Sequence, residues 1–478
     1  MHKKIINTAI VLSALVFVSY VAITCYGISK GQGVLANQGE GRDIYARLGI
    51  AAFALSLISF TLHFLGKTVA ATPKGVTLYL QSQVTLNYAL FITAILTSYY
   101  FVAPLNFLAP GMPFGHFWDF YSLAIYAHQG TVDDVTGTGY LPLTILLGKI
   151  FSFMLRFSEP GGNIKIDFLF YSVYLAVFLT ATGTLYAVCR RHIKDMSTRL
   201  VLLLIFVFSY PFIIEFERGN MVIISFIILA LMLSVDRHSN MFLVLAAMFA
   251  SLKILNLVIF APIFLYCGWG RSFKAGGLFV AITVLSYLVL AYPMALDLNY
   301  ARMPNTLRAM GPFPDFHQFA AHSDLYALYR GFALSFNSHT YDAFYQTFFK
   351  LAGVITGAFF LINYRKLDFD TFLFIIFIVV SMFLLFTTDM NLILLIPLLV
   401  LLLGRALAEK DNAWCLMIFI LALPVLSLNT SPMVRLFDPP TKTYAYFSLR
   451  HILIPIQLAA ILYTIYWYKI RGKSAAKA

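Results

Sequence analysis

Charged residues are scarce in this sequence. Lys, Arg, Asp and Glu together make up 12% of its 478 residues, whereas an ordinary soluble domain carries about 25%. Hydrophobic residues make up 60% of the chain, and the mean hydropathy is +0.81. No soluble domain needs that much apolar surface, so the composition excludes a soluble globular protein and indicates a membrane protein.

Several sequence motifs are also absent. The chain has no P-loop, no G-x-S-x-G motif and no internal repeat. Acidic residues are not spread through paired repeats in the way that a secondary transporter would require. Four cysteines, scattered in or at the ends of apolar stretches, show neither metal-ligand spacing nor an obvious pairing: Cys25, Cys189, Cys267 and Cys415.

Apolar stretches long enough to cross a bilayer recur from one end of the chain to the other. We expect an all-α polytopic fold with roughly fourteen transmembrane helices and both termini in the cytoplasm. The first stretch, Ile5–Tyr26, is too long for the apolar region of a signal peptide and lacks an A-x-A-like cleavage site, so we interpret it as a span. The expected spans lie near residues 5–28, 46–66, 84–104, 166–189, 199–214, 221–235, 240–253, 255–267, 273–293, 345–362, 370–388, 391–404, 413–428 and 449–468.

Two segments leave the topology open. Residues 140–157 are apolar enough to span but carry Lys149 and Arg156. We interpret them as an interfacial helix, because the basic cluster Arg190–Lys194 then faces the cytoplasm. With this choice the whole net charge of +13 lies on the inner face, which favours contact with anionic lipid and not with nucleic acid. The short stretches between 240 and 267 suggest a broken or re-entrant pair.

The chain therefore divides into five predicted regions, defined by their relation to the membrane. Two of them are outer loops that are long and rich in aromatic residues, Pro and Gly. In order, the regions are N-terminal spans (1–104), an outer loop with interfacial helices (105–165), core helices (166–293), a second outer loop (294–344) and C-terminal helices (345–478).

The first outer loop contains one carboxylate among aromatic residues, in the stretch Phe117–Tyr121. Asp119 stands near the start of an expected amphipathic helix, where it could cap the helix amides. Alternatively, it could act as a general base that takes the proton from an attacking hydroxyl. The sequence leaves both interpretations open.

Two further polar sites interrupt apolar sequence. The corner Glu215–Asn220 is either a solvated turn, with Gly219 left-handed, or a site where Arg218 binds an anionic headgroup. Lys253 either extends its ammonium group to the membrane interface or neutralises a phosphate in a cavity at membrane depth.

The second outer loop adds cations among Tyr and Phe residues, including His317, His322 and Arg330. The spacing of Asp315, His317, His322 and Asp324 is weak evidence for a metal. Contact with a sugar or a lipid phosphate is the favoured interpretation, and we expect no metal and no cofactor.

The order and spacing of several motifs over residues 105–270 resemble the C-type integral-membrane glycosyltransferases. More narrowly, they resemble the polyprenol-phosphate-mannose-type transferases of glycosyltransferase family eighty-seven. One departure from the family is Asn256, where a proline is common. The residues that carry the resemblance are Trp118–Tyr121 with Tyr126–Ala127, Gly139–Pro142, Glu217–Asn220, Leu252–Lys253 and Trp269.

This resemblance implies an inverting transferase at the outer face of a bacterial plasma membrane, with Asp119 as its base. It would move a single hexose, mannose or glucose, from a polyprenyl phosphate to a lipid-linked or cell-envelope glycan acceptor. Arg218 and Lys253 are the expected phosphate partners. The other candidate substrate-binding residues are Tyr121, Glu217, Asn220, His317, His322 and Arg330. Two alternatives remain: an O-antigen ligase or polymerase that uses polyprenyl-diphosphate glycans, and a transporter of lipids or small molecules.

Overall fold

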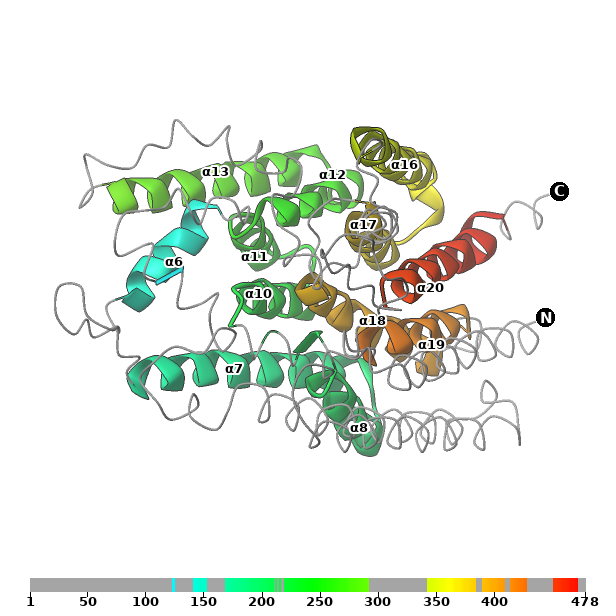
Figure 1. Ribbon diagram of the computed structural model, residues 1–478, viewed down its shortest axis with the longest axis horizontal. Coiled ribbons are helices and arrows are strands. Elements are labelled where there is room, and N and C mark those ends of the chain that lie inside the picture. The colour runs from blue at the N-terminus through cyan, green and yellow to red at the C-terminus, as the bar shows by residue number, and fades with distance from the viewer. Residues whose placement is uncertain are drawn as a thin grey trace, which may run out of the picture. The chain divides into compact units, whose positions relative to one another are not determined.

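The computed structural model describes ten segments of the chain (Figure 1). Every regular element within them is a helix, which confirms the all-α prediction for this part of the chain. The described residues are 123–124, 141–152, 168–209, 211–212, 215, 219–291, 342–383, 389–408, 413–427 and 450–471.

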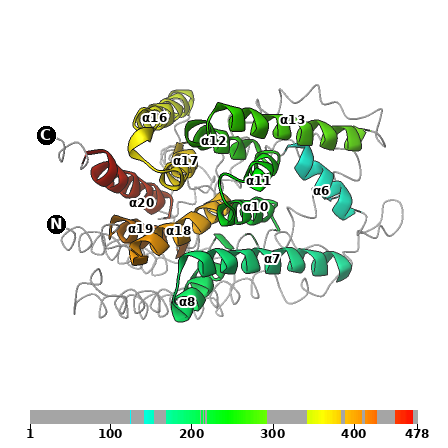
Figure 2. The same cartoon turned by 180° about the vertical axis from the view of Figure 1, so that it is seen from behind.

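The described residues form two compact units. We call residues 123–188 and 215–291 the central unit, and residues 189–212 and 342–471 the C-terminal unit. The boundary between the units falls within α7 (Phe168–His192). Figure 2 shows the same helices from behind.

The central unit is built around α11, which packs against both α10 and α13. α13 also packs against α6 and α12. Ser239 caps the start of α11, where its hydroxyl accepts a 3.1 Å hydrogen bond from the Phe242 amide. The helices of this unit are α6 (Pro142–Ser152), α10 (Val222–Ser234), α11 (Asn240–Ala250), η2 (Ile254–Ile259), α12 (Phe260–Cys267) and α13 (Trp269–Ala291).

In the C-terminal unit, consecutive helices from α16 to α20 pack against one another, and α17 also packs against α20. The unit contains α8 (Met196–Val207), α16 (Asp342–Ile362), η5 (Tyr364–Lys366), α17 (Phe369–Phe383), η6 (Asp389–Leu394), α18 (Leu395–Ala408), α19 (Ala413–Ser427), α20 (Arg450–Ile465) and η8 (Tyr466–Arg471). Hydrogen bonds from Thr198 and then Ser197 lower the pKa of Asp195, the cap of α8, to about 2.

The expected apolar segments between 166 and 468 each coincide with a described helix to within several residues. Among the described helices, two are long and apolar enough to cross a membrane: Trp269–Val289 and Asn391–Ala408. The first of these exposes a row of large apolar side chains, among them Phe273, Leu285 and Leu288, as a lipid-facing helix does. The expected spans before residue 105 and the second outer loop lie outside the described residues.

The apolar stretch between 240 and 267 is broken, as its sequence suggested. α11 has 11 residues, or about 16 Å at 1.5 Å per residue, and α12 has 8. Lys253 between them has extended backbone angles, with φ −146° and ψ 143°. Such a break is tolerated at membrane depth where protein groups satisfy the freed backbone.

Polar groups of the central unit form hydrogen bonds with the backbone around this break. The carbonyl of Leu252 accepts hydrogen bonds from the Leu141 amide at 3.1 Å and from the Thr144 hydroxyl at 2.6 Å. The buried side-chain amide of Asn256 donates to the Phe249 carbonyl at 2.9 Å and to the Ser225 hydroxyl at 3.0 Å. A proline in place of Asn256 could make neither of these side-chain bonds, so the departure from the family pattern has a structural role here.

Several helix ends meet at one end of the C-terminal unit. Gly404 approaches the last turn of α7 so closely that a Cβ atom there would lie 2.7 Å from the His192 carbonyl oxygen. Lys366 of η5 donates to the Ile470 carbonyl at 3.3 Å, and the Lys469 ammonium lies 4.5 Å from the centre of the Trp414 ring. We call this the basic end, because Arg190–Lys194, Arg365–Lys366, Arg405 and Lys469–Arg471 lie on the segments that meet there.

Candidate functional site

The described part of the predicted site lies in the central unit and consists of Asn220 and Lys253. The other predicted site residues lie outside the described residues: Asp119, Tyr121, Glu217, Arg218, His317, His322 and Arg330. Their roles stay predictions, and the geometry below concerns the elements beside them in the sequence.

The corner before α10 contains the predicted left-handed glycine. Gly219 has φ 66°, and its amide donates to the Glu215 carbonyl at 2.8 Å. The side-chain oxygen of Asn220 accepts a 3.0 Å hydrogen bond from the Val222 amide and so satisfies the first turn of α10. Asn220 is buried, with 7% of its surface exposed. The corner is therefore not the solvated turn that one interpretation of the sequence expected, at least over its described residues.

Glu215 belongs to the corner that the sequence marked, but it was not among the predicted substrate-binding residues. Its exposed fraction is 0%, so the carboxyl group lies entirely inside the protein. Burial of a carboxylate costs several kcal/mol unless other groups compensate it, so a fully buried acid in this corner is a candidate for orienting the residues around it.

Lys253 lies at the break between α11 and η2, and its side chain is half-buried. The hydrogen bonds from Leu141 and Thr144 to the Leu252 carbonyl attach the start of α6 beside it. Leu141 and Pro142, the described residues of one motif, therefore lie beside Leu252 and Lys253 of another. A lysine of intermediate exposure at such a break can bind an anion at a lower desolvation cost than a fully buried one.

Asn220 lies at the same end of the central unit as Lys253. α10 and α11 are packed neighbours joined by a short turn, so the start of α10 lies beside the end of α11. The 3.0 Å hydrogen bond between Ser225 of α10 and Asn256 of η2 supports this alignment. The described residues of three motifs thus lie at one end of the unit, although they are far apart in the sequence: Leu141–Pro142, Gly219–Asn220 and Leu252–Lys253.

Trp269 does not join them. Arg271, two residues further on, donates to the carbonyls of Arg237, His238 and Ser239 at 2.7–2.8 Å. Those carbonyls belong to the turn between α10 and α11, at the opposite end of α11 from Lys253. Trp269 instead contacts Phe264, with ring centres 4.3 Å apart, and is largely exposed. Trp269 therefore lies apart from Asn220 and Lys253 within the central unit.

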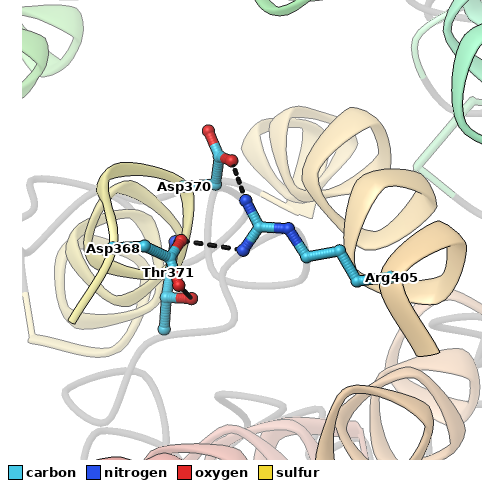
Figure 3. Close-up of polar contacts among 4 residues, drawn as sticks. All are labelled: Asp368, Asp370, Thr371 and Arg405. Carbon is cyan, nitrogen blue, oxygen red and sulfur yellow. Dashed lines mark hydrogen bonds and ion pairs between the residues drawn. The ribbon is translucent and has the colours of Figure 1, made fainter. Parts of the chain in front are cut away.

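The C-terminal unit contains a partly buried ion-pair cluster that the sequence did not single out (Figure 3). Arg405 of α18 forms ion pairs with both Asp368, at 2.8 Å, and Asp370. The amide and hydroxyl of Thr371 also donate to Asp368, at 3.0 and 2.8 Å. Asp370 is 1% exposed. The cluster fastens the start of α17 to the end of α18, and we assign it a structural role.

Charge and hydrogen bonding set the protonation state of Asp368. Burial raises its pKa, but the neighbouring Arg405 guanidinium and the bonds from Thr371 outweigh burial and lower the pKa to about 2. The carboxylate is therefore ionised at neutral pH. The sequence shows only two signs of this cluster. One is Arg405 within an apolar segment, and the other is the pair Asp368 and Asp370 at the start of a second apolar segment.

Within the described segments, no group of three or more His, Cys, Asp or Glu side chains is placed to hold a metal ion. The histidines and acids of the second outer loop lie outside those segments. The described cysteines, Cys189, Cys267 and Cys415, form no disulfide bond with one another.

Comparisons with known proteins identify no relative. No protein-family model matches the chain, and no curated protein or solved structure shows significant similarity to it.

Proposed function

We propose that this protein is an inverting glycosyltransferase of the membrane. It moves a single hexose from a polyprenyl phosphate to a lipid-linked or cell-envelope glycan on the outer face of a bacterial plasma membrane. The observation that supports the proposal is the position of Leu141–Pro142 at the helix break that carries Leu252–Lys253, with Gly219–Asn220 at the same end of the central unit. A helix break beside a cation provides a polar site among apolar helices, as a phosphate at membrane depth requires.

The chemistry needs three groups. The acceptor hydroxyl oxygen forms a bond to the anomeric carbon as the bond from that carbon to the phosphate oxygen breaks. Asp119 takes the hydroxyl proton, and the bonding electron pair leaves with the lipid phosphate. Arg218 and Lys253 stabilise the negative charge that develops on this leaving group. A single displacement inverts the anomeric centre.

Replacement of Asp119 tests the proposal. Asp119→Asn keeps the size of the side chain but removes the base, so we expect the transfer rate to fall about 10²- to 10⁴-fold. The assay uses the purified full-length chain, radiolabelled polyprenyl-monophosphate mannose or glucose, and a membrane extract as acceptor. Asp236→Asn is the matched control, because Asp236 is exposed and its interaction with the His238 amide needs only an oxygen acceptor.

The outcomes separate the alternatives. Transfer by Asp119→Asn at the wild-type rate would refute the assignment of the base. Transfer only from a polyprenyl-diphosphate glycan would favour a ligase or polymerase. Movement of lipid across vesicles without sugar turnover would identify a transporter.

A further inference from the structure

Two helices of the C-terminal unit, α16 and α20, meet near their C-terminal ends, and each exposes large apolar side chains. α16 has 21 residues, which extend about 31 Å at 1.5 Å per residue. The side chains of Val354 and Ile362 on this helix are 67% and 80% exposed, and Tyr463 of α20 is 61% exposed. Phe359 contacts Tyr466, with ring centres 5.7 Å apart, so the end of α16 lies beside the end of α20. A face of this length and character is suited to the acyl chains of a bilayer.

Aromatic rings and cations border this face where the two helices end. We call Tyr364–Lys366 together with Tyr466–Arg471 the rim. Arg365 lies 5.9 Å from the centre of the Tyr364 ring, and Arg471 lies 4.2 Å from that of Trp467. Tyr463 contacts both Tyr466 and Trp467. The 3.3 Å hydrogen bond from Lys366 to the Ile470 carbonyl joins the two halves of the rim.

The rim has no negative charge of its own. It contains two arginines and two lysines, and no acidic residue. Asp368, two positions beyond it, is ion-paired with Arg405. Arg365 and Arg471 are both exposed, so their charge is directed outward next to the apolar face. Tyr and Trp gather at the membrane–water interface, and long cationic side chains extend to the same level.

We propose that the rim binds the headgroup of an acidic phospholipid whose acyl chains lie along the exposed face of α16 and α20. The guanidinium groups of Arg365 and Arg471 bind the headgroup phosphate, because the planar donors of arginine match its oxygens. The aromatic rings hold these guanidinium groups in place and lower the entropy cost of binding. This surface belongs to the C-terminal unit, and the proposal holds whether or not the protein transfers a sugar.

The test compares phosphatidylglycerol with phosphatidylcholine. The full-length protein in detergent is titrated with each lipid, and bound lipid is counted by native mass spectrometry. We expect tighter binding of phosphatidylglycerol. Because a cation near the surface contributes about 1 kcal/mol, each arginine removed should weaken that binding about fivefold, and Arg365→Ala/Arg471→Ala about 25-fold.

The matched control removes two exposed lysines outside the rim. Lys274→Ala/Lys350→Ala changes the net charge by the same amount and should leave the affinity unchanged. Arg365→Lys/Arg471→Lys keeps the charge but loses the planar donors, so it should recover only part of the binding. If the alanine variant does not fold, a salt titration of the wild type decides, because added NaCl must weaken binding of phosphatidylglycerol.

Four results would overturn the proposal. One is equal binding of the two lipids, and another is an equal loss in the lysine control. A third is displacement of the lipid by glycerol phosphate at matched concentration, which would identify an anion site without a lipid preference. The fourth is a dimer that the arginine variant dissociates, because the surface would then bind a second copy of the chain.

Discussion

The position of Lys253 follows from the residues on either side of it. Leu252 is buried and its carbonyl is hydrogen-bonded to the start of α6, while Asn256 is buried and bonded to α10 and α11. The lysine between them has extended backbone and a half-buried side chain. Its neighbours therefore fix the backbone position of Lys253, and the flexible side chain determines how far the ammonium group extends from it.

Replacement of this lysine should impair sugar transfer. A hydrogen bond to a charged group contributes about 1.5–3 kcal/mol, so we expect Lys253→Met to lower kcat/KM about 10- to 100-fold. Lys253→Arg should recover part of the activity, because the charge is kept. Lys274→Met, which removes an exposed lysine of α13, serves as the control. Unchanged activity in Lys253→Met would mean that the lysine only extends to the membrane interface.

Asp368 should make stability depend on pH in the acid range. Its pKa is lowered from 3.8 to about 2 in the folded protein, so the unfolded chain binds the proton more tightly. The stabilisation is present above about pH 4 and is lost as the pH falls towards 2. Asp368→Asn should therefore be less stable by about 1 kcal/mol at pH 7, a value reduced for solvent screening.

Chemical denaturation in detergent at pH 7 and near pH 2 measures this effect. The difference between wild type and Asp368→Asn should narrow at the lower pH. A constant difference would show that the carboxylate charge is not what stabilises the junction. Asp195, whose pKa is also lowered, is present in both proteins and cancels in the comparison.

At the scale of elements, the junction of α17 and α18 depends on one arginine (Figure 3). Removal of one partner from a buried ion pair is much more costly than replacement of the whole pair, because a charge is left in an apolar environment. Without Arg405, the carboxylate of Asp370 would lose this ion pair while almost completely buried.

Arg405→Met should destabilise the protein by about 3–5 kcal/mol, as measured by chemical denaturation. The double variant Arg405→Met/Asp370→Leu should recover much of that loss, because the almost fully buried charge of Asp370 is gone and the remaining Asp368 is partly exposed. Arg365→Met, at an exposed position near the same end, is the control and should change stability by less than about 0.5 kcal/mol. Equal effects of the two arginines would show that the cluster contributes no more than a surface charge.

At the scale of the whole molecule, the basic end predicts how the protein is oriented in a membrane. Short loops rich in Lys and Arg favour the cytoplasmic side, and contacts within the C-terminal unit bring several such segments together. Since they meet at one end of a compact unit, they must all face the same side of a membrane. This structural argument constrains the topology more than a count of charges does, because one basic segment cannot move to the other side of the membrane without the others.

Single cysteines at positions 191, 365 and 471, introduced into a chain without its native cysteines, test this orientation. A membrane-impermeant maleimide should label none of them in intact cells and all three after permeabilisation. A cysteine at position 217, in the predicted outer corner, should react in intact cells. Labelling of one basic-end position without the other two would contradict the structure, and labelling of all three in intact cells would reverse the predicted orientation.

Much of the described fold was predictable from sequence. Apolar runs between 166 and 468 predicted helices because a long apolar segment satisfies its own backbone only as a helix. The left-handed Gly219 and the break near Lys253 were also anticipated, since glycine and a charge in an apolar run are local signals. Of the candidate site, the sequence supplied the residue types, but only Asn220 and Lys253 can be compared with the structure.

The sequence by itself determined the helical class, the apolar character and the position of the breaks, because each depends on residues close together in the chain. Only the tertiary structure decided that Leu141 contacts Leu252, that Trp269 lies at the other end from Lys253, and that Glu215 is buried. It also decided that Arg405 pairs with acids 35 and 37 residues away. These features depend on which helix faces pack together. Hydropathy along the chain shows that a helix face is apolar, but not which other helix packs against it.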